Sequence, residues 1–123
     1  MATEVTIPDP AFANGRRWPR YRIDVPIRLI AIKGDTASIV QGRGNELNDG
    51  GMTIFAGIEL GLDEQVAIEF TPPYSGQPIR VRGCIRNRAG YTYGVEFTLA
   101  TDDDCQNVGL IRAILGGMGR RVQ

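Results

Sequence analysis

Apolar and polar residues alternate along most of the chain between residues 21 and 99. The alternation is clearest at the start of this region, where every second residue is apolar: Tyr21, Ile23, Val25, Ile27 and Leu29. A period of two residues is typical of a strand with one buried face, because successive side chains point to opposite faces. Pro26 has no N–H to donate, so this strand is expected to lie at a sheet edge or to contain a bulge.

Five further segments are predicted to be strands, and residues typical of turns separate most of them. They cover residues 37–47, 51–57, 64–70, 79–88 and 91–99. The pattern places Ile79, Val81, Gly83 and Ile85 on one face, and Arg80, Arg82, Cys84 and Arg86 on the other. In the last segment the expected core face carries Tyr91, Tyr93, Val95, Phe97 and Leu99. Six short strands without an intervening helix predict an antiparallel barrel or sandwich.

The C-terminal region has a helical period instead. Thr101 can serve as an N-cap, and the acidic residues 102–104 place negative charge in the first turn. Apolar residues then recur at helical spacing, at Cys105, Val108, Ile111, Ile114 and Leu115. We therefore predict one helix over residues 102–115, ended by Gly116 and Gly117. Its apolar stripe either closes an end of the barrel or meets another chain.

The 123 residues suit one domain. Residues 1–15 contain Pro8, Pro10 and Gly15 without periodicity, which predicts a flexible N-terminal arm. The domain is expected to span residues 16–117, and a flexible tail to span residues 118–123.

Charge and composition argue against several classes of function. The 14 basic and 14 acidic residues balance, so no overall field draws the protein to nucleic acid or an anionic membrane. The chain has no histidine, so we expect no catalytic residues, zinc site or cofactor. Its two cysteines do not make a disulfide scaffold. No signal peptide and no apolar run of about 20 residues is found, which predicts a cytoplasmic protein without membrane insertion.

A cluster of arginines precedes the first predicted strand, in the sequence NGRRWPRYR at residues 14–22. Arg16 and Arg20 are four residues apart, and Arg17 is a further candidate. A guanidinium can bind a phosphate or a guanine edge through two hydrogen bonds, or stack on a base. Arg22 is expected on the solvent face of the strand. The alternative is a solvated basic turn whose arginines pair with acids such as Asp24.

A second candidate motif, ELNDGG at residues 46–51, lies between two predicted strands. The Glu46 carboxylate can accept hydrogen bonds from a guanine edge, and the Asn48 amide can bind ring acceptors or phosphate oxygens. Gly51 allows either a ligand or another part of the chain to approach closely. The alternative is a plain turn that uses Asn, Asp and Gly because they tolerate positive φ.

Together the two motifs and the strand pattern resemble the PilZ domain, a bacterial family of cyclic-di-GMP receptors. Arg16 and Arg20 match the R-x-x-x-R motif of that family, and ELNDGG stands in register with its [D/N]-x-S-x-x-G motif. The later YGVEF at residues 93–97 is also similar, so the resemblance covers residues 15 to 115. Two positions depart from the family pattern, since Glu46 replaces Asp or Asn, and Asn48 replaces Ser.

The resemblance implies a six-stranded antiparallel PilZ-type β-barrel with a C-terminal α-helix. It implies a stand-alone receptor that binds cyclic-di-GMP on its outer surface, with a site formed by Arg16, Arg17, Arg20, Glu46, Asn48 and Gly51. The ligand would order the arginine loop, and the signal would pass to a protein effector of flagellar, pilus or polysaccharide-synthesis machinery. Both a monomer and a homodimer remain open.

Two alternatives remain at this stage. The first is a PilZ-like adaptor that binds no cyclic-di-GMP, which the departures at Glu46 and Asn48 favour. The second is a small barrel that binds single-stranded nucleic acid through arginines and the aromatic residues Trp18, Tyr91 and Tyr93. The balanced charge counts against the second, and so does the expected position of both tyrosines on the core face.

Overall fold

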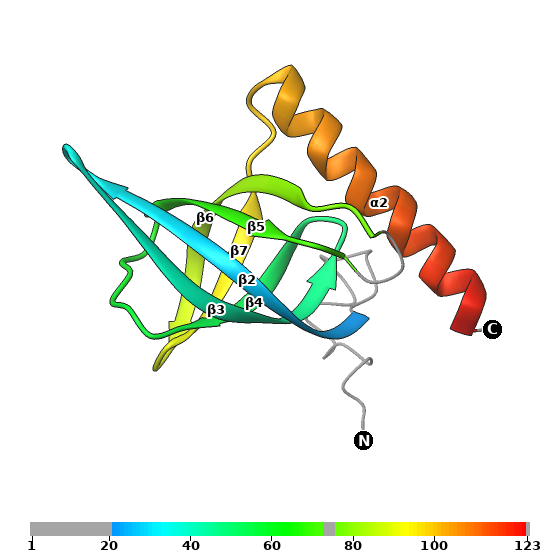
Figure 1. Ribbon diagram of the computed structural model, residues 1–123, viewed down its shortest axis with the longest axis horizontal. Helices are drawn as coiled ribbons and strands as arrows, with labels where there is room; N and C mark the ends of the chain where they lie inside the picture. The colour runs from blue at the N-terminus through cyan, green and yellow to red at the C-terminus, as the bar shows by residue number, and fades with distance from the viewer. Residues whose placement is uncertain (1–20, 73–75, 123) are drawn as a thin grey trace.

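The protein is a closed antiparallel barrel with a C-terminal helix (Figure 1). The computed structural model describes residues 21–72 and 76–122, with side chains up to residue 116. These residues contain the strands β2 (Tyr21–Lys33), β3 (Thr36–Asn48), β4 (Gly51–Ala56), β5 (Gln65–Phe70), β6 (Ile79–Ala89) and β7 (Thr92–Phe97), and the helix α2 (Asp102–Val122). The strand order is β2-β3-β4-β7-β6-β5, so the predicted six-stranded barrel with its C-terminal helix is confirmed. The predicted arm, residues 1–15, lies outside the described residues.

The alternation of apolar residues predicts most of the core correctly. The predicted faces of β6 are confirmed, because Ile79, Val81 and Ile85 are buried while the arginines point outward. Tyr93, Val95 and Phe97 are buried in β7, but the prediction is wrong for Tyr91 and Leu99, which are exposed. Both residues lie beyond the ends of the strand, where the chain no longer follows the pleat that alternates side chains.

The bulge expected near Pro26 is also confirmed. The register between β2 and β3 shifts between Arg22 and Val25. On the other side of β2, pairing with β5 begins only at Ile27. Pro26 itself is paired with Arg43 of β3 just after this shift, but it precedes the first pair with β5, so a residue without an N–H is tolerated there.

Helix α2 begins at the predicted N-cap. The backbone N–H of Asp104 donates to Thr101 Oγ1 at 3.1 Å, and the Asp104 carboxylate accepts the backbone N–H of Thr101 at 3.1 Å. This reciprocal pair is a capping box. The stripe was predicted wrongly at one position, because Cys105 is exposed and Asp104 is buried in its place beside Val108 and Ile111.

The predicted end of this helix is wrong as well. Helix α2 does not stop at Gly116 and Gly117 but continues to Val122, so residues 118–122 are helical where an irregular tail was expected. Glycine weakens a helix interior by about 1 kcal/mol relative to alanine, but it ends a helix only when it adopts the left-handed conformation. No helix in the described part of the chain is long and apolar enough to cross a membrane.

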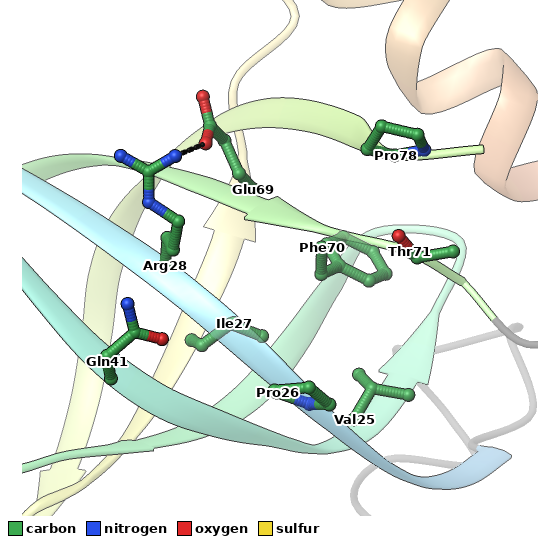
Figure 2. Close-up of a pocket in the computed structure, with 9 residues that line it drawn as sticks. All are labelled: Val25, Pro26, Ile27, Arg28, Gln41, Glu69, Phe70, Thr71 and Pro78. Atoms are coloured by element: carbon green, nitrogen blue, oxygen red, sulfur yellow. Dashed lines mark hydrogen bonds and ion pairs between the residues drawn. The ribbon is translucent and has the colours of Figure 1, made fainter. Parts of the chain in front are cut away.

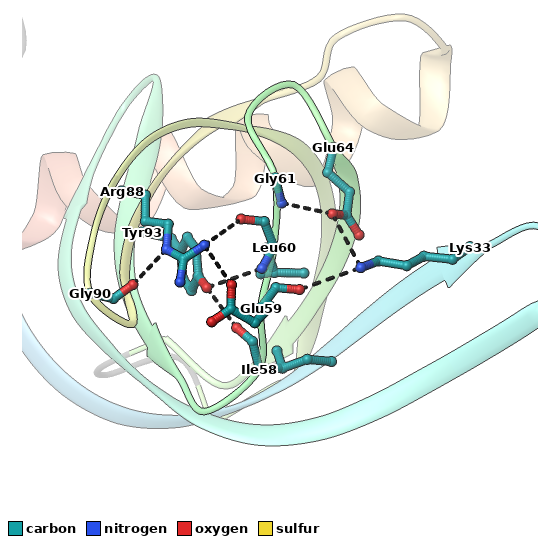
Figure 3. Close-up of polar contacts among 9 residues, drawn as sticks. All are labelled: Lys33, Ile58, Glu59, Leu60, Gly61, Glu64, Arg88, Gly90 and Tyr93. Carbon is teal, nitrogen blue, oxygen red and sulfur yellow. Dashed lines mark hydrogen bonds and ion pairs between the residues drawn. The ribbon is translucent and has the colours of Figure 1, made fainter.

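Different elements close the two ends of the barrel. At one end, Val108, Ile111 and Leu115 of α2 pack into the core. At the other end, the loop of residues 57–64 crosses the opening and places Leu60 in the core. The buried Tyr93 hydroxyl donates to the Ile58 carbonyl at 2.6 Å and accepts the Leu60 N–H at 3.1 Å (Figure 3). One side chain therefore satisfies two backbone groups of the loop.

A bidentate ion pair fastens α2 to the barrel wall. Arg82 of β6 donates from Nε to Asp104 Oδ1 at 2.8 Å and from Nη2 to Oδ2 at 2.6 Å. This hydrogen bonding by Arg82 lowers the pKa of Asp104 below its ordinary value of 3.8, and the N–H groups of Thr101 and Ala100 lower it further. The same carboxylate thus caps the helix and attaches it to β6.

We predict that Tyr93→Phe lowers the free energy of unfolding by about 1–3 kcal/mol, because it leaves buried backbone groups of the loop without a partner. Chemical denaturation followed by circular dichroism measures this change. Tyr91→Phe is the matched control, since Tyr91 is 45% exposed, and it should have little effect. Equal effects of the two variants would contradict the role given to the Tyr93 hydroxyl.

We also predict that the stabilising effect of Asp104 depends on pH. Its pKa is lower in the folded chain than in the unfolded chain, so its contribution is complete above about pH 5 and is lost as the pH falls through the ordinary value toward the folded one. The difference in unfolding midpoint between the native chain and Asp104→Asn should therefore shrink from neutral to acidic pH. Asp103→Asn, at an exposed neighbour, is the control. A difference that stays constant with pH would contradict the prediction.

Candidate functional site

The ELNDGG motif forms the turn between β3 and β4. Asn48 ends β3, Gly51 begins β4, and the two residues are paired across the hairpin. Asn48 is only 7% exposed, and its Oδ1 accepts the Gly50 N–H at 2.7 Å. The Asn48 amide thus closes the turn, as Asx turns do. The alternative interpretation was a turn that needs residues tolerant of positive φ, but Asn48, Asp49 and Gly50 all have ordinary φ values.

Gly51 has a structural reason to be glycine. A Cβ atom at this position would overlap the Val95 carbonyl oxygen of β7, which lies far inside van der Waals distance. Gly51 is paired with Glu96, and the Phe97 N–H donates to the Gly50 carbonyl at 2.9 Å. Of the two uses that the sequence left open, close approach of the chain itself is therefore present in the structure.

Glu46 lies half-buried on the outer face of β3. It is opposite Arg22 of β2 on one side and Thr53 of β4 on the other. The same row continues through Gly94 of β7 to Asn87 of β6. We call the five residues Arg22, Glu46, Thr53, Gly94 and Asn87 the site row. Thr53 and Gly94 are the small residues of this row, and the cation Arg22 and the carboxylate Glu46 lie at one of its ends.

Arg16, Arg17 and Arg20 lie outside the described residues. The chain that follows them is nevertheless well placed, because Tyr21 is paired with Leu47, the residue between Glu46 and Asn48. The described part of the barrel therefore begins beside the second motif. Arg22 is exposed on the outer face, as predicted.

The acid that the sequence offered as a partner for these arginines is already bound within the barrel. Arg43 of β3 donates to Asp24 Oδ1 from Nε at 3.0 Å and from Nη2 at 2.6 Å. Sequence reasoning did not single out Arg43. Only the alternation of β3 places it outward, and its contact with β2 depends on a register that no local pattern gives.

The outer face of β6 carries three arginines, Arg80, Arg82 and Arg86, and each has an acidic partner. Arg86 donates to Glu96 and to Asp63, both at 2.6 Å, and its pKa is raised chiefly by the hydrogen bond to Glu96. Arg82 holds Asp104, and Arg80 lies 3.7 Å from Glu69. Carboxylates of the same chain thus compensate the charge of this face.

Helix α2 touches the turn of the second motif. Arg112 Nε donates to the Asp49 carbonyl at 3.3 Å, which links the helix to the β3–β4 hairpin. No signal in the sequence indicated this contact, because the two residues are 63 positions apart. It connects the candidate site to the largest surface element outside the barrel.

A separate hollow of about 480 Å³ lies along the outside of β2 (Figure 2). Val25, Pro26 and Phe70 contribute to its lining, and Arg28 reaches across it to Glu69 at 2.9 Å. None of Glu46, Asn48 and Gly51 lines this hollow. The predicted motif therefore lies on the surface rather than in this depression.

The tyrosines do not form a platform for stacked bases. Tyr93 is completely buried, and its ring belongs to the core. Tyr91 is exposed, but the Arg88 guanidinium lies 5.9 Å from the centre of its ring. The alternative of a single-stranded nucleic-acid site thus loses one of the aromatic residues it required.

Comparisons with known proteins agree with this architecture. The family model described as PilZ domain matches residues 14–115. The structure is similar to a crystal structure of the PilZ domain of CeSA from a cellulose-synthesizing bacterium, with 19% identity and a TM-score of 0.61, over 79% of this chain and 95% of that one. It is also similar to the Bacillus subtilis inhibitor of motility MotI/DgrA, with 13% identity and a TM-score of 0.54, over 82% of this chain and 52% of that one. No protein of curated function matches the sequence.

Gly51→Ala tests whether packing determines the glycine of the motif. We predict that it lowers the free energy of unfolding by about 1–3 kcal/mol, because β4 must move away from β7 to admit the methyl group. Gly57→Ala is the control, since a Cβ atom there would meet nothing within 4 Å. Unfolding in denaturant measures both. A Gly51→Ala protein as stable as the native chain would contradict the packing explanation.

Proposed function

Because this chain belongs to the PilZ family, a family of cyclic-di-GMP receptors and adaptors, we propose that it binds cyclic-di-GMP and signals through protein contacts. It acts in the cytoplasm and without catalysis. The ligand binds on the outer surface of the barrel, between the arginine loop and the site row. Arg16 and Arg20 hold the phosphates and guanine faces, and Arg17 assists them.

The observation that carries this proposal is the register between β2 and β3. Tyr21 is paired with Leu47 and Arg22 with Glu46, so the first described residues after the arginine motif lie beside the second motif. This pairing supports a shared site for two motifs that are about 30 residues apart in sequence. We propose that a dianionic ligand held by two guanidinium groups lies over Thr53, beside Glu46.

The structure refines the roles that we propose for the second motif. Glu46 is the candidate contact for a guanine edge, because its carboxylate can accept from two adjacent donors. Asn48 Oδ1 is engaged with the Gly50 N–H, so the role of this residue is to fix the turn that presents Glu46. Gly51 contributes by allowing β4 to lie against β7.

The signal is proposed to leave the site by two routes. The first is the arm, which the ligand would order through Arg16 and Arg20 at some cost in binding free energy. The second is α2, since Arg112 contacts the turn that ends in Gly51. The effector belongs to flagellar, pilus or polysaccharide-synthesis machinery. The two similar structures, a PilZ domain of a cellulose-synthesizing bacterium and an inhibitor of motility, are consistent with that range.

One observation favours a second candidate function, a PilZ adaptor that binds no nucleotide. Asn48 stands where the family prefers serine, and it is buried and engaged within the turn. A side chain that is occupied in this way is not available to a ligand through its carbonyl oxygen. In that case the same turn and α2 would serve only as a protein-binding surface.

Calorimetric titration with cyclic-di-GMP separates the two functions. We expect the native chain to bind, and Arg20→Ala to weaken binding by about 10- to 150-fold, equivalent to the 1.5–3 kcal/mol of a hydrogen bond to a charged group. Arg80→Ala is the matched control, because Arg80 is an exposed arginine of β6 that lies 3.7 Å from Glu69, and β6 is not adjacent to β3 in the barrel; the affinity of this variant should match that of the native chain. Absence of binding by the folded native chain would favour the adaptor. Equal affinity of Arg20→Ala and the native chain would place the ligand elsewhere.

A further inference from the structure

The hairpin of β2 and β3 extends beyond the rest of the barrel (Figure 1). The ladder between β3 and β4 begins at Gly42, so among the described strands residues 36–41 of β3 are paired only with β2. In the described residues, no backbone hydrogen bond joins this stretch to another segment. We call residues Thr36–Gln41 the open edge. Within the described part of the chain, its outward backbone donors and acceptors have no partner strand.

The open edge lacks the features that usually protect such strands. Its sequence TASIVQ contains no charged residue and no proline, and both bulges of the hairpin lie outside it. Ile39 is 56% exposed at its centre, and Ile32 is exposed beside it on β2. Natural proteins usually block open edges with lysine, proline or a bulge, because an unprotected edge pairs with another strand.

The turn fixes which residues can form new hydrogen bonds. Lys33 and Thr36 flank a two-residue turn and form the first pair of the hairpin. Pairs that exchange hydrogen bonds alternate along an antiparallel ladder, so Thr36, Ser38 and Val40 direct their backbone groups toward β2. Ala37, Ile39 and Gln41 therefore direct theirs away from β2. A partner strand must be paired with these three residues.

We propose that two copies of this chain dimerise by antiparallel pairing of their open edges about a two-fold axis at Ser38. In this register Ala37 lies opposite Ile39 of the second copy, and Asp35 lies opposite Gln41 of the second copy. Ser38 faces its own counterpart across the axis. The sheet then continues through β2 and β3 of one copy into β3 and β2 of the other.

The length of the open edge favours this register. With the axis at Ser38, the second copy lies opposite residues 35–41. It ends before Gly42, the first residue of β3 that is paired with β4. If the axis moved to Ile39, Thr36 of the second copy would fall where Ala56 is paired with Gly42. The stretch that is free in one copy thus accommodates the same stretch of another, as a two-fold interface requires.

The charges agree with self-association. The paired stretches carry no like charges opposite each other, because Asp35 of each copy lies at a different end of the interface. Arg43 of the second copy lies two residues beyond Gln41 on the same face. It is therefore a diagonal neighbour of Asp35, although its guanidinium is already bound to Asp24 of its own chain. Opposite charges related by symmetry thus lie at each end of the apolar centre formed by Ile39 and Ala37.

This dimer leaves the candidate ligand site uncovered. Glu46 and Asn48 lie on the other half of β3, which is paired with β4. The inference does not rest on ligand binding, and a chain that binds no nucleotide would dimerise in the same way. With a ligand, the dimer would present two sites to an effector.

Analytical ultracentrifugation of the full chain and two variants tests the interface. We expect the native chain to approach twice its 13.5 kDa mass as the concentration rises. Ile39→Lys should remain a monomer, because it places a charge at the centre of the open edge. Leu110→Lys makes the same change at a similarly exposed residue of α2, and it should dimerise like the native chain.

Several outcomes would overturn the inference. One is a native chain that stays monomeric at every concentration, and another is an Ile39→Lys variant that still dimerises. Loss of the dimer only in Leu110→Lys would assign the interface to α2. Slow hydrogen exchange of Ala37, Ile39 and Gln41 in a monomeric chain would mean that another segment of the chain covers the open edge.

Cross-linking tests the register even if a charged variant folds poorly. In a chain with Cys84→Ser and Cys105→Ser, Ser38→Cys should form an intermolecular disulfide on mild oxidation, because directly opposed residues have Cα atoms within the range of a disulfide. Thr36→Cys is the control, since its counterpart in the second copy lies several residues away. Faster cross-linking of Thr36→Cys than of Ser38→Cys would overturn the proposed axis.

Discussion

The pairing of β2 with β3 is the constraint on which the rest of the structure depends. These are the two longest strands, and their ladder runs from Tyr21 opposite Leu47 to Lys33 opposite Thr36. One end of the ladder pairs Tyr21 and Arg22 with residues of the second motif, and the middle forms the barrel wall. The other end leaves the barrel and exposes a strand edge. The same register therefore determines the candidate ligand site and the proposed dimer interface.

Two polar contacts hold the elements that close this barrel. The Tyr93 hydroxyl binds both Ile58 and Leu60, so the loop at one end is fixed to β7. At the other end, Arg82 holds Asp104, which also caps α2. Each contact joins segments far apart in sequence through groups that are costly to leave unpaired. The ends of the barrel are thus fixed by specific partners as well as by apolar packing.

The sequence predicts the fold well because each strand carries its own alternation. The pattern is local, so the inward faces of β2 and β6 follow from it directly. It fails at Tyr91 and Leu99, because the alternation in the sequence extends beyond both ends of the strand. It also fails for α2, where the buried position belongs to Asp104 rather than to the neighbouring Cys105, because a partner on β6 compensates the carboxylate.

Only those parts of the candidate site that are defined by residue type and spacing can be predicted from the sequence. The two motifs could be found in the sequence, but the pairs Arg43–Asp24 and Arg112–Asp49 could not, because both depend on long-range register. The structure also changes the significance of the departures from the family pattern. A serine at position 48 would close the same turn through its hydroxyl, more weakly than the Asn48 amide does. Asn48 is therefore compatible with a turn of the same form, and the proposed binding of a ligand depends on Glu46 and the arginines that precede β2.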